Sequence, residues 1–380
     1  MAAADKSLSQ LRVQIDAIDN QLLLLLNKRA RLASEVGNLK RARAADTSFY
    51  VPHRERVIID RMKEANTGPF PTSAIRPVFQ EIISACLSLE AAVTVAYLGP
   101  QATFTHQAVR RHFGTSARTI PCNSIEAVFA EVERGQAEFG VVPVENSTEG
   151  VVNHTLDSFL DVELAITAEI VVAVDQCLLA QAGTQLATID RVYSHPQALA
   201  QCRGWLSKNL PKAAQVETHS TASAAQAAAK EHNTAAIAAE LATRVYGLQL
   251  LRAKLQDVSE NITRFLVINK TCARSLSIPT DGAPTDLNYK TSMVLSLPDQ
   301  ALPDRAGSLH DVLQPIAARG INLTRIESRP TRRKAWDYVF FLDLDGHVAD
   351  PNVAELVDEL TRICQLCKVL GCYQKADTYE

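Results

Sequence analysis

The sequence predicts a protein of several domains: an all-helical segment, then an α/β region, then a small α+β domain. Three observations predict this class. Apolar residues at alternating steps of three and four open the chain, short β-branched strands alternate with helices from Val93 onward, and a strand-helix-strand-strand-helix-strand pattern ends it. A chain of 380 residues has room for two or three domains. The expected divisions are 1–92, 93–272, a linker at 273–290, and 291–380.

The composition is typical of a globular protein, with 47% hydrophobic and 21% charged residues. A net charge of −3 gives no indication of a nucleic-acid partner. No apolar run has the length of a membrane span, and the N-terminal residues MAAADKSLSQLRVQ lack the apolar core of an export signal. We therefore expect a cytoplasmic protein with no membrane partner.

The eight cysteines are expected to be mostly free thiols, as is usual in a reducing compartment. Cys364 and Cys367 form a CQLC motif, and Cys372 follows closely. A zinc site needs about four ligands, and no second CxxC or histidine pair accompanies this one. Apolar spacing predicts one helix over 351–371, through the motif, so we interpret these cysteines as small apolar core residues. We expect neither a metal nor an organic cofactor.

The first helix is predicted over 7–43, which corresponds to roughly 55 Å. Its apolar seam follows a heptad-like spacing and comprises Leu8, Leu11, Ile15, Ile18, Leu22, Leu25, Leu32, Val36 and Leu39. A helix this long cannot bury such a stripe against one small domain. It needs other helices, and the most direct source is a second chain.

Arg29 occupies the seam position missing from that series. A cation among apolar residues is costly unless it is paired, so Arg29 either extends outward to water or awaits an anionic ligand. Lys40 lies about three turns later on roughly the same face. Arg12 is about 25 Å away along the helix and roughly 100° around it. Arg12 could therefore reach such a site only in a partner packed antiparallel.

Two more helices are predicted, over 52–65 and 72–91. With them in place, the stretches LRVQIDAIDNQLLLLLNKRARLASEVGNLK, HRERV and FQEIISACLSLE resemble the all-helical chorismate mutase domain. The resemblance implies an intertwined dimer that converts chorismate to prephenate. It assigns Arg12, Arg29, Lys40 and Arg54 to the carboxylates and ether oxygen of the substrate, Glu55 to the ring hydroxyl, and Glu90 to the ether oxygen. A glutamate can donate to that oxygen only while protonated. Val51 and Cys86 depart from residues that some members of the family carry.

In the α/β region, strands repeatedly end in Ser, Thr, Asn or His just before a helix. One such junction is ordinary N-capping, but several together can form an anion site, because strand ends and helix N-termini gather at one edge of an open sheet. The region resembles prephenate dehydratase. The matching motifs are GPQATFTHQA (99–108), PVENSTEG (143–150), YSHPQALAQC (193–202), HST (219–221) and ENITRF (260–265).

This second resemblance implies two subdomains like those of periplasmic binding proteins, with the chain crossing between them near 170 and 255. It also implies that prephenate loses its ring carboxylate and hydroxyl to give phenylpyruvate. Thr263 of the TRF motif is the expected catalytic residue, acting as a hydrogen-bond donor to the leaving hydroxyl. Arg264 either neutralises a substrate carboxylate or pairs with Glu260. Further expected substrate contacts are Thr103, Asn146, Ser147, Ser194, His195, Gln197 and Thr221.

The C-terminal pattern is that of a ferredoxin-like domain. It resembles an ACT domain of the phenylalanine-sensing type through GSLHDVL (307–313) and ESRP (327–330). The resemblance implies feedback by phenylalanine across a dimer interface, with the effector contacted by Gly307, Ser308, Leu309, Glu327, Ser328, Arg329 and Pro330.

Two alternatives remain beside the two-activity enzyme of phenylalanine biosynthesis. A non-catalytic amino-acid sensor on a binding-protein fold would explain the middle and end of the chain, but not Arg29 in the seam. A dehydratase that prefers arogenate would share every motif.

Overall fold

The computed structural model describes residues 7–43, 52–90, 92–270, 288–297, 306–331 and 337–376. The chain divides into two compact units. One contains Met1–Val93 with Phe113–Arg118, and the other contains Thr94–His112 with Thr119–Glu380. None of the helices in the described ranges combines the length and apolar composition that crossing a bilayer requires.

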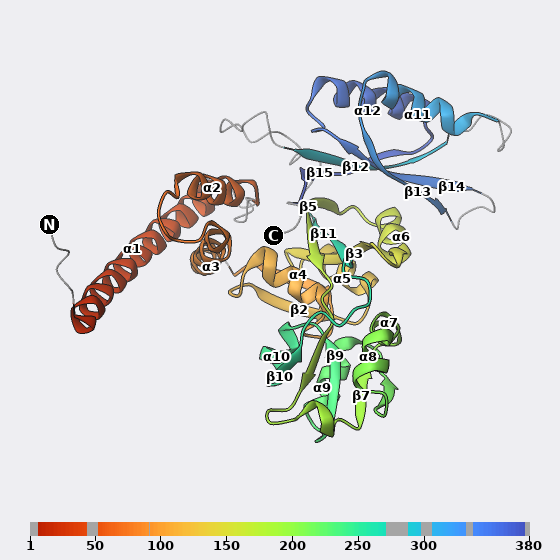
Figure 1. The fold of residues 1–380 in the computed structure, drawn as a ribbon. Coiled ribbons are helices and arrows are strands. Elements are labelled where there is room, and N and C mark those ends of the chain that lie inside the picture. The colour runs from red at the N-terminus through yellow and green to blue at the C-terminus, as the bar shows by residue number, and fades with distance from the viewer. Residues whose placement is uncertain are drawn as a thin grey trace. The chain divides into compact units, whose positions relative to one another are not determined.

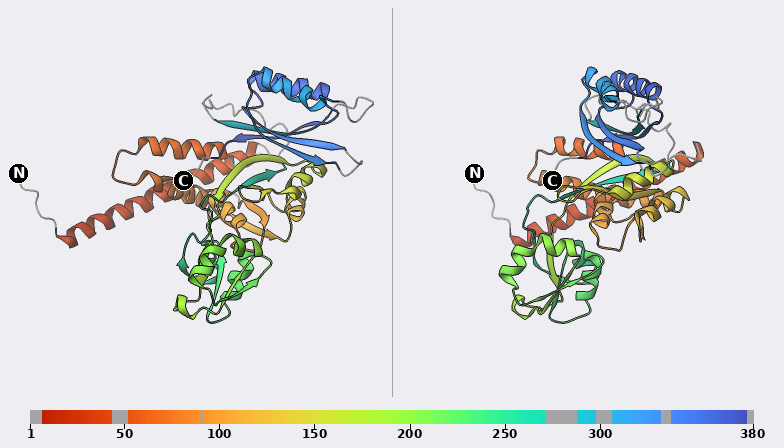
Figure 2. Two further views of the ribbon diagram at one scale, coloured as in Figure 1. Left: turned by 45° about the vertical axis from the view of Figure 1, so that its right-hand side comes forward. Right: turned by 90° about the vertical axis from the view of Figure 1, so that its right-hand side faces the viewer.

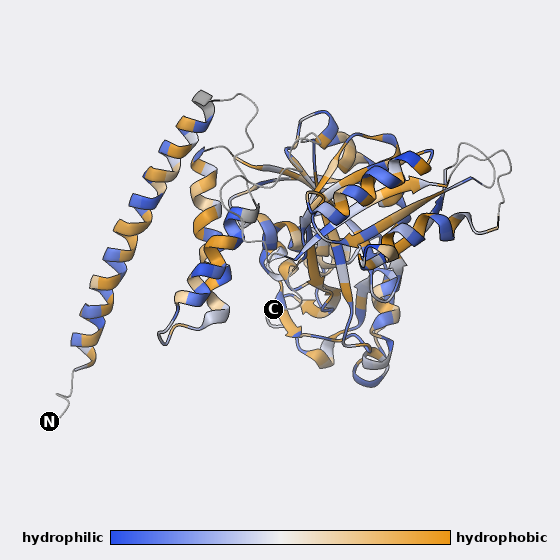
Figure 3. Cartoon of the chain, turned by 90° about the horizontal axis from the view of Figure 1, so that it is seen from above, coloured by the Kyte–Doolittle hydropathy of each residue, from blue (hydrophilic) through white to orange (hydrophobic). Residues whose placement is uncertain are grey.

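The first unit consists of the three predicted helices: α1 (Leu8–Arg43), α2 (Pro52–Ala65) and α3 (Thr72–Glu90), labelled in Figure 1. α3 lies between the other two in the packing and contributes most of the buried side chains, including Ile75, Ile83 and Cys86. α1 packs against α3, and its least exposed residues lie in its C-terminal half, where Gly37 is buried. The apolar seam of α1 is exposed in the single chain, and Figure 3 shows its hydrophobic residues recurring along the helix.

The second unit begins with a six-stranded sheet, called here the first sheet. Its path is β2-β1-β3-β11-β5, with β4 paired to β3. The strands are β1 (Thr94–Leu98), β2 (Arg118–Cys122), β3 (Phe139–Asn146), β4 (Gly150–Val151), β5 (Ala165–Ala173) and β11 (Ile262–Asn269). The helices of this subdomain are α4 (Phe104–Phe113), α5 (Ile125–Glu133) and α6 (Asn153–Asp161).

The second sheet has the order β10-β6-β9-β7-β8. Its strands are β6 (Cys177–Ala180), β7 (Arg191–Ser194), β8 (Ala214–Glu217), β9 (Thr234–Ala238) and β10 (Gln249–Arg252). The short helix η1 (Leu186–Thr188) precedes β7, and the α-helices are α7 (Pro196–Gln201), α8 (Arg203–Asn209), α9 (Thr221–Ala228) and α10 (Leu241–Tyr246). Separate apolar clusters form around the two sets of helices. Two α/β subdomains are therefore present, as predicted.

The chain passes from the first sheet to the second between Ala173 and Cys177, and returns between Arg252 and Ile262. The two crossing segments hydrogen-bond to each other. Val174 N donates to Asn261 O at 2.8 Å, and Leu255 N donates to Gln176 O at 2.9 Å. The two subdomains are consequently joined by a paired, short connection.

The C-terminal domain has the predicted βαββαβ order. Its elements are β12 (Tyr289–Ser296), α11 (Ser308–Ala318), β13 (Leu323–Pro330), β14 (Tyr338–Asp345), α12 (Pro351–Ile363) and β15 (Cys367–Gln374). The antiparallel sheet has the order β13-β14-β12-β15. Figure 2 shows α11 and α12 on one face of this sheet. The other face joins the core of the first α/β subdomain, where Val294, Phe341 and Leu370 cluster with Leu266 and Ile268.

The predicted last helix is too long. α12 ends at Ile363, and the CQLC motif forms the connection to β15, because residues from Cys367 onward pair with β12 instead. Cys364 is buried and Cys367 half-buried, and all seven cysteines in the described ranges carry free thiols. Those ranges contain no group of His, Cys, Asp or Glu suited to a metal ion. β12 begins at Tyr289, inside the predicted linker, and residues 273–287 lie outside the described ranges.

Candidate active sites

The sheet topology brings the predicted dehydratase residues to two facing edges. β1 and β3 are parallel, so Thr103, which follows β1, and Asn146, the last residue of β3, lie at one edge. Antiparallel β11 places Thr263 directly opposite Asn146. In the second sheet β7, β8 and β9 are parallel, so His195 and Thr221 also share an edge. The crossing segments leave one edge and enter the other, because Ala173 pairs with Ile262 and Cys177 with Ala238.

Thr263 is buried, and its hydroxyl accepts a hydrogen bond from Asn146 Nδ2 at 2.8 Å. The orientation of the Asn146 amide follows from its other contacts. Its Oδ1 accepts from the backbone N–H groups of Thr148 and Glu149, each at 3.0 Å, and these groups can only donate. Within the described ranges Asn146 is the hydrogen-bond partner of Thr263 Oγ1. The hydroxyl proton of Thr263 is therefore left to donate to a bound molecule.

The same cluster extends into the second subdomain through amide side chains. Asn146 Nδ2 lies 2.7 Å from Asn261 Oδ1, and Asn261 Nδ2 donates to Gln201 Oε1 at 3.1 Å. Gln201 ends α7, and it also accepts from Gln176 in the first crossing segment at 3.3 Å. Sequence reasoning did not assign roles to Gln201 or Gln176. Gln201 lies in YSHPQALAQC, so its motif was a signal, whereas the role of Gln176 needed the fold.

Several of the predicted contacts hold the local backbone. Ser147 Oγ donates to Glu260 O and accepts from Ile262 N, which fastens the end of β3 to the start of β11. Buried Ser194 donates to Ile237 O at 2.7 Å. Thr103 Oγ1 accepts from His106 N and donates to Leu98 O, both at 3.2 Å.

The other predicted contacts lie nearer the surface. His195 caps α7 and is half-buried, Gln197 is exposed, and Thr221 is half-buried at the start of α9. These three side chains are thus accessible at the edge of the second sheet.

His106 locks the loop that follows β1. Its Nδ1 accepts from Ala102 N at 3.0 Å, its Nε2 lies 3.2 Å from Arg110 Nε, and its ring stacks on Tyr97 at 4.9 Å. Ala102 has a φ of 65°, a backbone conformation that residues other than glycine rarely adopt without such support. Burial, reinforced by Arg110, lowers the pKa of His106 to about 4, so the ring is neutral and Nδ1 is free to accept from the Ala102 amide.

Arg264 pairs with protein carboxylates other than Glu260, which was one of its two predicted partners. Its guanidinium lies 2.6 Å from Asp343 of the C-terminal domain, 3.0 Å from Glu169 on β5 and 3.8 Å from Glu145 on β3. The pairing with Glu260 was wrong, because alternation along β11 sends the Arg264 side chain to the opposite face of the sheet from Thr263.

In the helical unit, Arg29 and Lys40 are half-buried on α1, on the face that carries buried Gly37. Glu90 of α3 is also buried and packs against Gly37 so closely that a Cβ there would lie 3.0 Å from the Glu90 Cβ and Cγ. Gly37 therefore lets Glu90 approach the helix that carries both cations.

The remaining mutase residues lie further out. Glu55 is half-buried, whereas Arg54 and Arg12 are exposed. Arg12 stands on the N-terminal half of α1, as its position in the sequence requires.

In the C-terminal domain, Gly307 has a φ of 95° and precedes α11. The C-terminus of α11 is joined to the start of β13 by a short connection. The N-terminus of α11, at Gly307 and Ser308, therefore lies toward the end of β13, which carries Glu327–Pro330. Ser308, Leu309 and Glu327 are half-buried, while Ser328 and Pro330 are exposed. Arg329 is engaged elsewhere: it forms a two-pronged pair with Asp157 of α6, at 3.0 and 2.9 Å.

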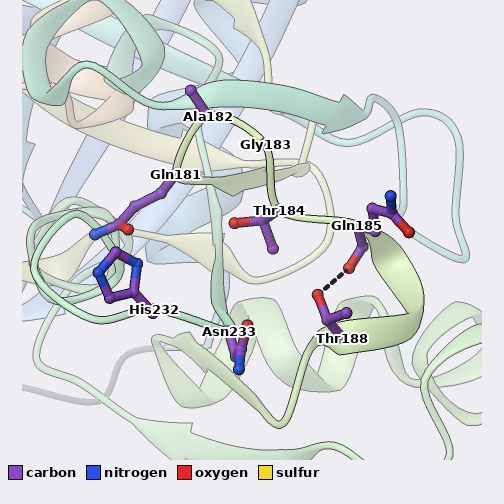
Figure 4. A pocket seen from close by; sticks show the side chains of 8 residues that line it. All are labelled: Gln181, Ala182, Gly183, Thr184, Gln185, Thr188, His232 and Asn233. Atoms are coloured by element: carbon purple, nitrogen blue, oxygen red, sulfur yellow. Dashed lines mark hydrogen bonds between the residues drawn. The ribbon is translucent and has the colours of Figure 1, made fainter.

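A separate polar hollow lies in the second subdomain, lined by Gln181, Gly183, Thr184, Thr188, His232 and Asn233 among others (Figure 4). These residues follow β6 or precede β9. Because β6 and β9 are antiparallel, this is the edge opposite to the one that carries His195. The hollow contains none of the predicted site residues.

Comparison with known proteins identifies the class of each part. The chain matches the family model of chorismate mutase type II over residues 11–91, that of prephenate dehydratase over 95–273, and that of the ACT domain over 301–362. A helical mutase, a two-subdomain dehydratase and an ACT domain thus define a multidomain enzyme.

Relatives that span the whole chain name the family. A bifunctional chorismate mutase/prephenate dehydratase of Aquifex aeolicus (strain VF5) is 46% identical, with 98% of this chain and 99% of the relative covered. One from Stutzerimonas stutzeri is 42% identical over 99% and 100% of the two chains. A solved prephenate dehydratase from Arthrobacter aurescens, in complex with L-Phe, is 36% identical with a TM-score of 0.66, covering 74% of this chain and 90% of that one.

The chain belongs to the family of bifunctional chorismate mutase/prephenate dehydratases, and it carries both enzymatic activities. It converts chorismate to prephenate and prephenate to phenylpyruvate. These matches give no support to a non-catalytic sensor or to a preference for arogenate.

Proposed function

We propose that Thr263 carries the dehydratase step. The observation behind this is the hydrogen bond from Asn146, which occupies an acceptor site of the Thr263 hydroxyl and leaves its proton to donate. In the reaction the ring carboxylate of prephenate leaves as CO₂ and its electron pair aromatises the ring. The ring hydroxyl departs, takes up one proton and becomes water. Thr263 orients or relays that proton, because a threonine hydroxyl is too weak an acid to supply it alone.

The two facing edges would hold the rest of the substrate. His195, Gln197 and Thr221 are accessible on one edge, and Asn146 and Thr263 lie on the other. Thr103, Ser147 and Ser194 would act by fixing the loops, which follows from their backbone hydrogen bonds. Amide bridges through Gln201 and Asn261 would keep the two edges in register.

For the mutase step we propose that Arg29, Lys40, Arg54 and Glu55 hold the chorismate dianion, and that protonated Glu90 donates to the ether oxygen. A pericyclic rearrangement needs the substrate held in its reactive shape and donors aimed at the developing charge. Glu90 packed at Gly37, between Arg29 and Lys40 along α1, supports this arrangement.

A homodimer would complete the mutase site. Nine seam residues of α1, from Leu8 to Leu39, are large, apolar and exposed in the single chain. Fully burying one such side chain is worth about 1.5–3 kcal/mol, so a second copy of α1 is a strongly favoured occupant of the seam. In an antiparallel pair Arg12 of the partner would approach Arg29.

We further propose that phenylalanine binds the ACT domain and inhibits the dehydratase. The Arthrobacter aurescens relative, solved in complex with L-Phe, supports this ligand. Gly307, Ser308 and Leu309 with Glu327, Ser328, Arg329 and Pro330 remain the proposed contacts, with Arg329 acting partly through Asp157. The seven free thiols in the described ranges fit a reducing cytoplasm.

Thr263→Ala tests the dehydratase assignment. We expect phenylpyruvate formation from prephenate to fall by about 10²–10⁴-fold, the range of a lost proton-transfer contribution. The mutase activity of the same preparation should stay within about twofold, because the two sites are separate. Thr263→Ser, which keeps the hydroxyl, should recover part of the rate.

Thr167→Ala is the matched control. Thr167 lies on β5 of the same sheet, and its hydroxyl contacts the Val267 carbonyl at 3.4 Å. Its dehydratase activity should resemble that of the unaltered enzyme. A Thr263→Ala enzyme that still forms phenylpyruvate at a comparable rate would rule out the proposed role.

A further inference from the structure

Thr263 and Arg264 are neighbours on β11 that face opposite ways. Thr263 pairs with Asn146 across the ladder and shares its hydrogen-bond cluster, on the side of the crossing segments. Arg264 leaves the other face and reaches the ACT sheet. Thr263, the proposed catalytic residue, is thus the immediate neighbour in the chain of Arg264, which the regulatory domain binds.

Arg264 is held by a cluster of charged and hydroxyl groups from both the dehydratase and the ACT domain. Asp343 on β14 accepts from Arg264 at 2.6 Å and from Ser292 Oγ at 2.5 Å, and Ser292 lies 2.6 Å from the Tyr373 hydroxyl. Tyr373 OH also accepts from Arg264 at 3.3 Å. Three strands of the ACT sheet, β12, β14 and β15, therefore converge on one guanidinium.

The dehydratase side of the cluster is formed by Glu169 and Glu145. Glu169 Oε2 lies 3.0 Å from Arg264 Nε, in an ion pair without hydrogen-bond alignment, and accepts from Lys290 of β12 at 2.8 Å. Glu169 Oε1 accepts from the Ala376 backbone at 2.9 Å. Glu145 lies between Arg264, at 3.8 Å, and Arg325 of β13, at 3.5 Å.

The cluster is balanced in charge and buried except at Glu145, whose side chain is 41% exposed. Side-chain exposure is 14% for Arg264, 4% for Glu169, 6% for Asp343 and 11% for Lys290. The cations are Arg264, Lys290 and Arg325, and the anions are Glu145, Glu169 and Asp343.

Burial by itself would lower the pKa of Arg264, but Asp343 and the other neighbours raise it, so the guanidinium stays charged. Burial by itself would raise the pKa of Asp343, but Arg264 and Ser292 together hold it below its usual value. Removing one member of such a set leaves a buried charge unmatched, so the cluster resists sliding of one sheet over the other.

Because the ACT sheet binds the Arg264 side chain, a shift of that sheet that moves Arg264 also moves its neighbour on β11, Thr263. A repacking of β12 or β14 that displaces Asp343 pulls on the Arg264 side chain. The backbone of Arg264 is continuous with that of Thr263.

Next to the cluster, Val294, Phe341 and Leu266 make apolar contacts, which are less directional than an ion pair. The ion pair of Arg329 with Asp157 also crosses the interface, but it holds α6 and not β11.

We propose that Arg264 is a positioning residue for the dehydratase: through its pair with Asp343, it makes the placement of Thr263 depend on the state of the ACT sheet. This inference rests on the proposed dehydratase and regulatory functions. On this proposal the inhibition passes through the face of β11 that carries Arg264. Phenylalanine favours one arrangement of the ion cluster, and substrate favours the other.

Asp343→Asn removes the charge and keeps the shape, which makes it the central variant. Asp345→Asn is the matched control: it lies two residues along the same strand, but pairs with Lys375 and Asn322 inside the ACT domain. Prephenate turnover is measured with and without phenylalanine, and phenylalanine binding is measured by calorimetry. Hydrogen exchange of residues 257–269 is followed on adding phenylalanine.

In Asp343→Asn we expect turnover without phenylalanine to stay within about threefold and phenylalanine still to bind. The half-inhibitory concentration should rise at least fivefold, a typical size for allosteric coupling. The exchange change in 257–269 seen in the unaltered enzyme should disappear. Asp345→Asn should retain both responses.

The proposal is overturned if Asp343→Asn keeps its inhibition, or if Asp345→Asn loses inhibition to the same extent. If Asp343→Asn does not fold, Ser292→Ala decides, since it removes one hydrogen bond from Asp343: a half-inhibitory concentration shifted twofold or more supports the proposal, and an unchanged one overturns it. An enzyme that forms no phenylpyruvate, yet shows the exchange response and loses it in Asp343→Asn, would refute the dehydratase function and leave the coupling standing.

Discussion

At the scale of single residues, two neighbours of one motif have separate tasks. Thr263 faces the amide cluster and Arg264 faces the ACT sheet. The sequence indicated Thr263 through its resemblance to prephenate dehydratase, in which the TRF motif carries the expected catalytic threonine. It could not identify the partners of Arg264, since Asp343 lies 79 residues away in another domain. The alternation of side chains along a strand predicts that Arg264 and Thr263 face opposite sides of the sheet, but it does not predict what Arg264 contacts.

His106 makes the stability of the dehydratase domain depend on pH. Its pKa of about 4 lies below the ordinary 6.5, so between these values the unfolded chain binds a proton that the folded chain does not. The free energy of unfolding therefore falls as pH falls through this window, by about 2 kcal/mol at pH 5. His106→Gln should reduce the drop in Tm between pH 7 and pH 5.

His219→Gln is the control, because His219 is exposed near the second sheet. It should show the same drop in Tm as the unaltered protein. If both variants lose equal stability on acidification, the buried histidine is not the source of the pH dependence.

At the scale of elements, the periodic helices were predictable and the last helix was not. The bounds of α1, α2 and α3 follow from apolar spacing and from Pro52, which suits a first helical turn. The spacing also continued past Ile363, where the chain instead forms β15. Seven residues paired to β12 outweigh a helical pattern that local sequence cannot distinguish from a strand.

The exposed seam of α1 leads to a prediction about shared mutase sites. If Arg12 serves the partner's site and Arg29 its own, Arg12→Ala and Arg29→Ala are each inactive alone. In a mixed dimer one site is intact and the other lacks both arginines. Half of the dimers are mixed after random exchange of subunits, so about a quarter of the unaltered mutase activity should return.

The measurement is chorismate loss after joint partial unfolding and refolding of the two variants in equal amounts. Each variant refolded alone is the control, and prephenate turnover reports equal recovery of folded protein. No return of mutase activity in the mixture, with dehydratase activity recovered, would place Arg12 outside the partner's site.

At the scale of the whole molecule, the ACT domain is built into the dehydratase. Its sheet shares an apolar core with α5, α6 and the first sheet, and Lys368 and Arg329 bind residues of the dehydratase directly. Deleting the ACT domain would uncover this core along with Arg264 and Glu169. A deletion therefore changes the support of β11 as well as the sensor, which is why single substitutions separate the two effects.

Gly371 is the position where the fit between the domains is tightest. A Cβ at this residue of β15 would overlap the carbonyl oxygen of Ile166 on β5, and a backbone atom cannot rotate away. Gly371→Ala should force the two sheets apart, at a cost of about 1–3 kcal/mol. We expect a lower Tm for the dehydratase, faster hydrogen exchange in residues 257–269 and weaker inhibition by phenylalanine.

Cys372→Ala controls for general disturbance of β15, since Cys372 is the next residue and removing its sulfur adds no atoms. Its exchange in 257–269 and its inhibition should match the unaltered enzyme. Mutase activity should be preserved in both variants, because the helical unit is separate from the unit that contains β15. A Gly371→Ala enzyme with unchanged exchange in 257–269 and full inhibition would show that regulation does not need the close contact of β15 with β5. The ion cluster would then have to carry the signal across a looser interface.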